Sequence, residues 1–114
     1  MAAPRYEVER KHSRYSLDAR AKLSAGETEI TVRTVDVSEG GIGVLSPVEL
    51  AGGSAFSIEL VFPTMQDLFH AEVVTQSRCG FRYGFRFTEI DEKNKALLHK
   101  YERRWGIRIS AAGA

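Results

Sequence analysis

The sequence predicts a mainly β fold: a six-stranded antiparallel β-barrel with a C-terminal α-helix packed on it and a flexible N-terminal arm. Six segments between residues 16 and 90 alternate apolar and polar side chains, with turn residues between them. The apolar period then lengthens to three and four residues over 91–106, as in a helix. The length of 114 residues, 43% of them hydrophobic, suits one globular domain with a single core. We therefore expect a flexible arm over residues 1–16, the barrel and helix over 17–106, and a tail over 107–114.

The six expected strands are residues 16–24, 28–38, 40–46, 55–62, 68–79 and 81–90. The first alternates without interruption, with its apolar side chains from Leu17 to Leu23 on one face. In the second, the apolar positions change parity at Arg33–Thr34, which indicates a bulge there or burial of both faces. The third follows a glycine turn and is closed by Pro47, and the fourth is stopped by Pro63.

The last two strands continue the alternation on either side of a turn at Gly80. Aromatic rings occupy every second position of the sixth strand: Phe81, Tyr83, Phe85 and Phe87. Aromatic residues interleaved with arginines are also typical of a strand that stacks on RNA bases. Here Arg82 and Arg86 alternate onto the opposite face, away from the rings. We therefore expect the rings in the barrel core and expect no nucleic-acid binding.

The helix is expected to begin after Asp91, a suitable N-cap residue, and to end at Gly106. Its apolar residues recur at three- and four-residue intervals, at Leu97, Leu98, Tyr101 and Trp105. This stripe needs a surface to cover it, and the barrel is the partner available within the chain.

Composition argues against several classes of protein. A net charge of +1 is too small for charge-driven nucleic-acid binding. One cysteine, Cys79, excludes an internal disulfide. With no signal segment and no long apolar run, we expect a cytoplasmic protein without membrane insertion. His70 and His99 lack metal-type spacing, and no catalytic or phosphate-loop motif occurs, so we expect no metal, no cofactor and no enzymatic activity.

Two polar motifs are not required by this fold. The first spans residues 9–14, E-R-K-H-S-R, and holds Arg10, Lys11 and Arg14 in a stretch without an apolar residue. No core contact can fix such a stretch, so its simplest interpretation is a solvated charge run. An arginine guanidinium can also grip a phosphate or the O6/N7 edge of guanine with two hydrogen bonds.

The second motif spans residues 36–41, D-V-S-E-G-G. In a strand, Asp36 and Ser38 project to one side while the neighbouring valines point to the other, so the valines can anchor in the core. A carboxylate suits the N1–H and N2–H₂ edge of guanine, and Gly40 and Gly41 let a ligand approach the backbone. The same residues could also form a polar turn that ends the strand, and the two roles are compatible.

The order and spacing of R-x-x-x-R (Arg10 to Arg14) and D-x-S-x-x-G (Asp36 to Gly41) resemble the PilZ domain family. The resemblance covers residues 5–105 and includes the six strands, the closing "YGFRF" strand and the terminal helix. It implies a non-enzymatic receptor for the bacterial second messenger cyclic di-GMP. The implied ligand-binding residues are Arg10, Lys11, Arg14, Asp36, Ser38, Gly40 and Gly41.

The resemblance also implies a mode of signalling. The arm would become ordered over the bound ligand, and a downstream protein partner in motility or exopolysaccharide machinery would read the new surface. Many family members have a further basic residue before the first arginine, whereas this chain has Glu9, which favours one bound ligand over a stacked pair. The alternative function is a PilZ-like adaptor that binds protein and no nucleotide.

Overall fold

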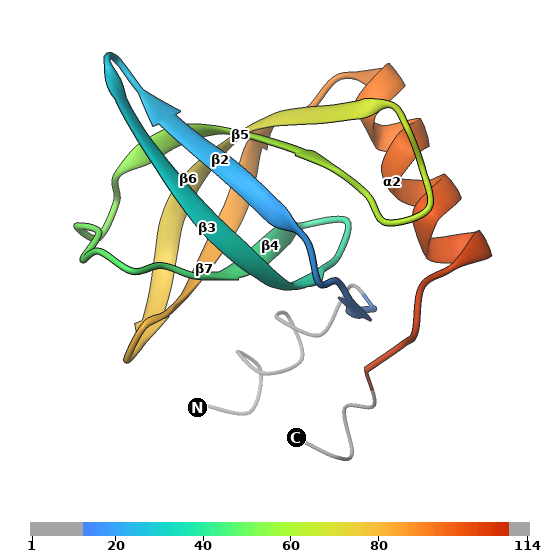
Figure 1. The fold of residues 1–114 in the computed structure, drawn as a ribbon, viewed down its shortest axis with the longest axis horizontal. Helices are drawn as coiled ribbons and strands as arrows, with labels where there is room; N and C mark the ends of the chain where they lie inside the picture. Colours follow the sequence, from blue (N-terminus) through green and yellow to red (C-terminus); the bar gives the residue numbers. More distant parts are fainter. Residues whose placement is uncertain (1–12, 110–114) are drawn as a thin grey trace, which may run out of the picture.

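The structure is a computed structural model, and it describes residues 13–109. Its elements, in chain order, are β1 (Tyr15–Ser16), β2 (Arg20–Ala25), β3 (Thr28–Val37), β4 (Gly41–Leu45), β5 (Ala55–Val61), β6 (Leu68–Cys79), β7 (Arg82–Glu89) and α2 (Glu92–Arg104). Figure 1 shows the strands wrapped around a common centre, with α2 at one side. No helix in residues 13–109 is long and apolar enough to cross a membrane.

Six antiparallel strands close into a barrel, as the sequence predicts. Neighbouring strands follow the order β3-β2-β5-β6-β7-β4, and β4 pairs back onto β3 to complete the ring. The short strand β1 adds to the free side of β3 through the pairs Tyr15↔Val37 and Ser16↔Asp36. The last residues of the predicted arm, 15 and 16, thus form a strand, and residues 1–12 lie outside the described part of the chain.

The predicted bulge in the second long strand is present, one residue further along. The register between β3 and β4 shifts between Thr34 and Asp36. The Thr34 hydroxyl is buried there, donates to the Leu17 carbonyl at 2.9 Å and accepts from the Ala19 amide at 2.8 Å. The Thr34 side chain satisfies these backbone groups where the predicted first strand, 16–24, is interrupted: Ser16 belongs to β1, and β2 begins only at Arg20.

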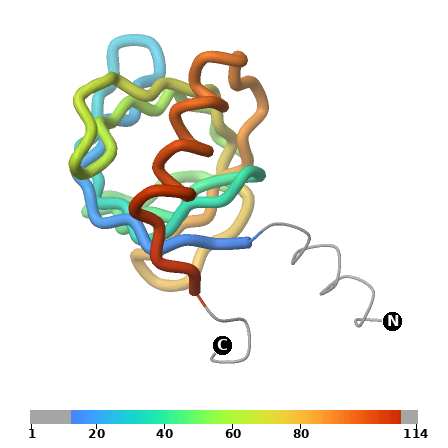
Figure 2. The backbone as a smooth tube through the Cα atoms, turned by 90° about the vertical axis from the view of Figure 1, so that its right-hand side faces the viewer, coloured from blue at the N-terminus to red at the C-terminus, as the bar shows by residue number. Residues whose placement is uncertain are grey.

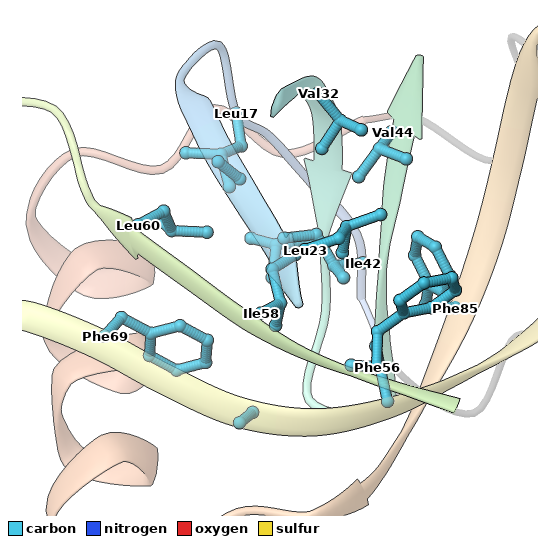
Figure 3. Close-up of a cluster of buried hydrophobic side chains, with 14 of the residues drawn as sticks. Leu17, Leu23, Val32, Ile42, Val44, Phe56, Ile58, Leu60, Phe69 and Phe85 are labelled. Carbon is cyan, nitrogen blue, oxygen red and sulfur yellow. The ribbon is translucent and has the colours of Figure 1, made fainter. Parts of the chain in front are cut away.

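The barrel interior is filled by the alternating apolar residues of all six strands together with Leu17, which precedes β2, and Figure 3 labels several of them. Tyr83 and Phe85 are buried in this core, and Phe87 packs against it, as expected. Phe81 was expected there too, but its side chain is 71% exposed. The reason is that β7 begins at Arg82, which leaves Phe81 in the preceding turn, outside the alternation of the strand.

The helix covers the barrel with the predicted apolar face. Asp91 is the N-cap, and its carboxylate accepts a hydrogen bond from the Asn94 amide at 2.9 Å. Leu97, Leu98 and Tyr101 are buried, and the Tyr101 ring stacks on Phe62 with a centroid distance of 4.9 Å. Trp105 does not join this face: it lies one residue beyond the helix and is 40% exposed. In Figure 2 the helix crosses in front of the barrel and ends beside the start of the described chain.

Candidate functional site

The Asp36 carboxylate is shared by two arginines from distant parts of the chain. Its Oδ2 atom accepts a hydrogen bond from Arg14 Nη2 at 2.8 Å and another from Arg82 Nη2 at 2.6 Å. The Asp36 side chain is only 3% exposed, whereas Arg14 and Arg82 are 52% and 47% exposed. The carboxylate is therefore covered by two guanidinium groups that keep roughly half of their surface open to solvent. The three groups together carry one excess positive charge.

Backbone pairing brings Arg14 to this position. Strand β1 starts at the next residue and pairs with β3 directly beside Asp36. On the side of β1 that faces away from β3, the chain is bonded to the C-terminal segment. The Ile109 amide donates to the Arg14 carbonyl at 2.8 Å, and the Ser16 amide donates to the Ile107 carbonyl at 2.8 Å. The C-terminal segment thus holds the base of the arm in place, and Figure 2 shows the two chain segments side by side.

Glycines remove side chains from the outer barrel face beside Asp36. Asp36 is paired with Gly43 of β4, which is paired in turn with Gly84 of β7. A Cβ on Gly43 would lie 2.5 Å from Asp36 Oδ1, so the carboxylate occupies the space that a side chain would fill. A Cβ on Gly84 would likewise lie 2.5 Å from Ser77 Oγ, so the two glycines let the Asp36 and Ser77 side chains lie close against the backbone of the sheet.

Gly41 has a different role from the one expected. A Cβ there would lie 2.0 Å from the backbone oxygen of Phe85 in the neighbouring strand. Gly41 is therefore required for the close approach of β4 and β7, whereas the sequence predicted a close approach of a ligand. The Ser38 hydroxyl accepts from the Gly40 amide at 3.2 Å, and the Ser38 amide donates to the Gly41 carbonyl at 2.8 Å. These bonds form the polar turn that the sequence allowed.

The structure brings five of the seven predicted site residues into one region and adds another arginine. Asp36, Ser38, Gly40 and Gly41 lie consecutively on β3, the turn and β4, and Arg14 is bonded to Asp36. Arg10 and Lys11 lie outside the described residues. The addition is Arg82, which sequence reasoning placed on the outer face of its strand without linking it to Asp36. The link depends on the β3–β4–β7 strand order, which no pattern in the sequence predicts.

The prediction that Asp36 projects outside the core is confirmed, but the expectation that its carboxylate is open to a ligand is wrong. The carboxylate does point away from the interior, since its partners Gly43 and Gly84 alternate with core residues. The arginines nevertheless cover it, so a ligand meets guanidinium groups first.

A second polar cluster joins the turn after β3 to the helix. His99 Nε2 lies 2.7 Å from Glu39 Oε2, and a carboxylate oxygen of Glu102 is the third candidate ligand atom, with all three within 4.8 Å of one another. The pKa of Glu102 is raised to about 7, mainly because the group is buried; His99 opposes the rise and Glu39 adds to it. The expectation that His99 has no metal-type neighbour is therefore wrong.

Together, the closed barrel and the paired arginines define a small β-barrel domain with a charged site on its outer face. A family model of the PilZ domain matches residues 9–104. The chain therefore belongs to the PilZ domain family. No curated protein sequence was found to be significantly similar.

Solved structures share the fold. The Bacillus subtilis inhibitor of motility, MotI/DgrA, superposes with a TM-score of 0.71 at 17% identity over 82% of this chain. This chain spans about half of that protein, 49% of its length. The PilZ domain of Escherichia coli YcgR, solved with cyclic di-GMP, gives a TM-score of 0.63 at 24% identity, covering 79% of this chain and 86% of that one. The PilZ domain of CeSA from a cellulose-synthesizing bacterium gives 0.60 at 19% identity, covering 76% and 91%.

Proposed function

We propose that this protein is a non-catalytic receptor that binds cyclic di-GMP on the outer face of β3, β4 and β7. The observation that carries the proposal is the buried Asp36 carboxylate shared by two half-exposed arginines, Arg14 and Arg82. Membership of the PilZ family and the cyclic di-GMP held by the YcgR domain support the choice of ligand.

The ligand's chemistry matches the groups presented. Cyclic di-GMP has two anionic phosphates and two guanine bases, whose O6 and N7 atoms are paired acceptors. Arg14 and Arg82 present donors in a rigid fork, and Asp36 fixes the orientation of both guanidinium groups before the ligand arrives. Pre-orientation reduces the side-chain entropy that binding would otherwise cost. Asp36 then acts mainly as the residue that positions the arginines.

The arm and the turn complete the proposed site. Arg10 and Lys11 would reach the phosphates from the arm that leads into Arg14, and Ser38 and Gly40 would border the ligand from the turn. We expect the arm to become ordered on binding, which would lower the net affinity. Micromolar binding corresponds to about −8 kcal/mol, within reach of a few bidentate contacts at ~1–3 kcal/mol each. A downstream protein would read the ordered arm.

Isothermal titration calorimetry of cyclic di-GMP into the wild-type protein tests this proposal. Arg14→Ala and Arg82→Ala should each lower the affinity at least tenfold, about 1.4 kcal/mol. Arg78→Ala is the matched control, because Arg78 is also a half-exposed arginine in an ion pair, with Glu49, yet lies away from Asp36. Absence of binding by the wild type would refute the receptor and favour the adaptor function.

Two analogues test the chemistry of recognition. Cyclic di-AMP should not compete, since adenine lacks the O6 acceptor that the arginines would bind. Cyclic di-IMP keeps O6 and N7 but lacks the 2-amino group, so it should bind nearly as well if the arginines read the base. A large loss with cyclic di-IMP would instead mean that Asp36 leaves its arginines and takes the N1/N2 edge directly.

A further inference from the structure

We propose that Glu39, His99 and Glu102 form a binding site for a divalent transition metal of the Zn²⁺ type. This site is separate from the Asp36 site, and its test does not depend on the proposed function. It joins the turn between β3 and β4 to α2, two parts of the chain that are 60 residues apart.

The donor atoms are of the kind that such a metal takes. One imidazole nitrogen and two carboxylates suit Zn²⁺, whereas Mg²⁺ and Ca²⁺ prefer shells made of oxygen alone. His99 and Glu102 are three residues apart on α2, so both project from the same side of the helix. Glu39 approaches them from the turn, with its Oε2 2.7 Å from His99 Nε2.

The spacing is close to that of a metal-bound set. Ligand atoms bound tetrahedrally to Zn²⁺ at 2.0–2.2 Å are about 3.4 Å apart. The three donor atoms lie within 4.8 Å of one another, and the hydrogen-bonded pair need only separate slightly. Side-chain rotation of partly exposed residues can make these adjustments without moving the backbone. Three protein ligands would leave the fourth position for water or an incoming group.

A second observation points to a missing cation. Among the described residues, Glu102 Oε2 is a buried side-chain oxygen for which no hydrogen-bond partner is present. A buried carboxylate oxygen without a partner is costly, and a bound cation would satisfy it. His70 offers a useful contrast, since it lies 3.4 Å from Glu72 but finds no second carboxylate within residues 13–109 that would complete a triad.

Calorimetric titration of ZnCl₂ into untagged, chelator-treated protein tests the proposal, with MgCl₂ titrated in parallel. We expect saturable binding of one Zn²⁺ per chain and no heat of binding with Mg²⁺. Glu39→Gln, His99→Ala and Glu102→Gln should each lower the Zn²⁺ affinity at least tenfold, while His70→Ala leaves it unchanged.

The outcomes are distinguishable from a folding defect and from adventitious binding. Glu102→Gln is nearly isosteric, and circular dichroism of each metal-free variant verifies that it is folded. Absence of saturable Zn²⁺ binding by the wild type would overturn the proposal, and the unpartnered oxygen would then belong to a protonated carboxyl group. Zn²⁺ binding of unchanged affinity in each of the two single variants, Glu102→Gln and His99→Ala, would also overturn the proposal.

Discussion

Replacing Gly41 with alanine is expected to destabilise the barrel itself, beyond any effect on ligand binding. The added Cβ would lie 2.0 Å from the Phe85 backbone oxygen and 3.1 Å from its carbonyl carbon. Since Cβ contacts shorter than 3.0 Å are essentially never found, β4 and β7 would have to separate by at least about 1 Å. The neighbouring atoms are backbone, so no side-chain rotation relieves the clash.

The loss of stability can be estimated from the contacts that are broken when β4 and β7 separate. The Phe87 amide donates to the Gly40 carbonyl at 3.0 Å at this end of the ladder, and that bond would be lost. A lost hydrogen bond costs about 0.5–1.5 kcal/mol, and forcing extra atoms into a packed region costs about 1–3 kcal/mol. We therefore expect Gly41→Ala to lower the free energy of unfolding by about 2–4 kcal/mol, a large part of the ~5–15 kcal/mol of a typical domain.

Urea denaturation followed by circular dichroism measures this change. Gly52→Ala is the matched control, since a Cβ there meets nothing within 4 Å and the backbone does not require glycine. Its free energy of unfolding should stay within about 0.5 kcal/mol of the wild-type value. If Gly41→Ala is as stable as Gly52→Ala but no longer binds cyclic di-GMP, the reasoning is wrong and Gly41 acts at the ligand.

Three further predictions concern the site and the helix. Gly43→Ala should push the Asp36 carboxylate away from its two arginines, because the new Cβ would lie 2.5 Å from Asp36 Oδ1. The affinity for cyclic di-GMP, measured by calorimetry, should then fall at least tenfold. An unchanged affinity would contradict the role of Asp36 in positioning the arginines. Asn94→Ala removes the acceptor of the His70 amide, at 2.8 Å, and should lower the free energy of unfolding by about 1–3 kcal/mol in urea. Hydrogen bonds from the Asn94 amide and side chain lower the pKa of Asp91, so the folded chain binds this proton less readily than the unfolded chain. The stabilisation by Asp91 is thus fully present above its ordinary pKa and is lost as the pH falls through the lower folded value. The difference in Tm between wild type and Asp91→Ala should be constant near neutral pH and shrink in acid, and a difference that persists in strong acid would contradict this.

The fold could be predicted because its signals are local. Alternation within each strand marks which residues face the core, and the change of period marks the helix. The errors fall at the ends of elements, where the period no longer applies. Phe81 continues the alternation of β7 but lies in the turn, and Trp105 continues the helical stripe but lies past the last turn.

The site could be predicted only in part because it is assembled from non-local pairings. The two motifs identify Arg14 and Asp36 separately, and their hydrogen bond agrees with the expectation that they act together. Arg82 could not be linked to them, since its place depends on β7 pairing with β4 and β4 with β3. For the same reason the burial of Asp36 was missed: only the three-dimensional arrangement shows two guanidinium groups above it.

The helix is tied to both halves of the proposed ligand site. On the arm side, the Tyr101 hydroxyl donates to the Ser16 carbonyl at 2.9 Å, and residues 107–109 pair with the base of the arm. On the turn side, His99 bonds Glu39, the residue directly after Ser38.

If cyclic di-GMP binds as proposed, these hydrogen bonds would connect the ligand site to the helix. Ligand that holds both the arm and the turn would restrain α2 from two directions, so we infer that the helix and the segment after it carry the response to a partner. Hydrogen exchange should then show cyclic di-GMP slowing amide exchange in residues 99–109 as well as beside Asp36. Tyr101→Phe, which removes only the hydroxyl, should reduce that remote protection more than it reduces affinity. Protection confined to the outer face of β3, β4 and β7 would mean that the response stays at the arm.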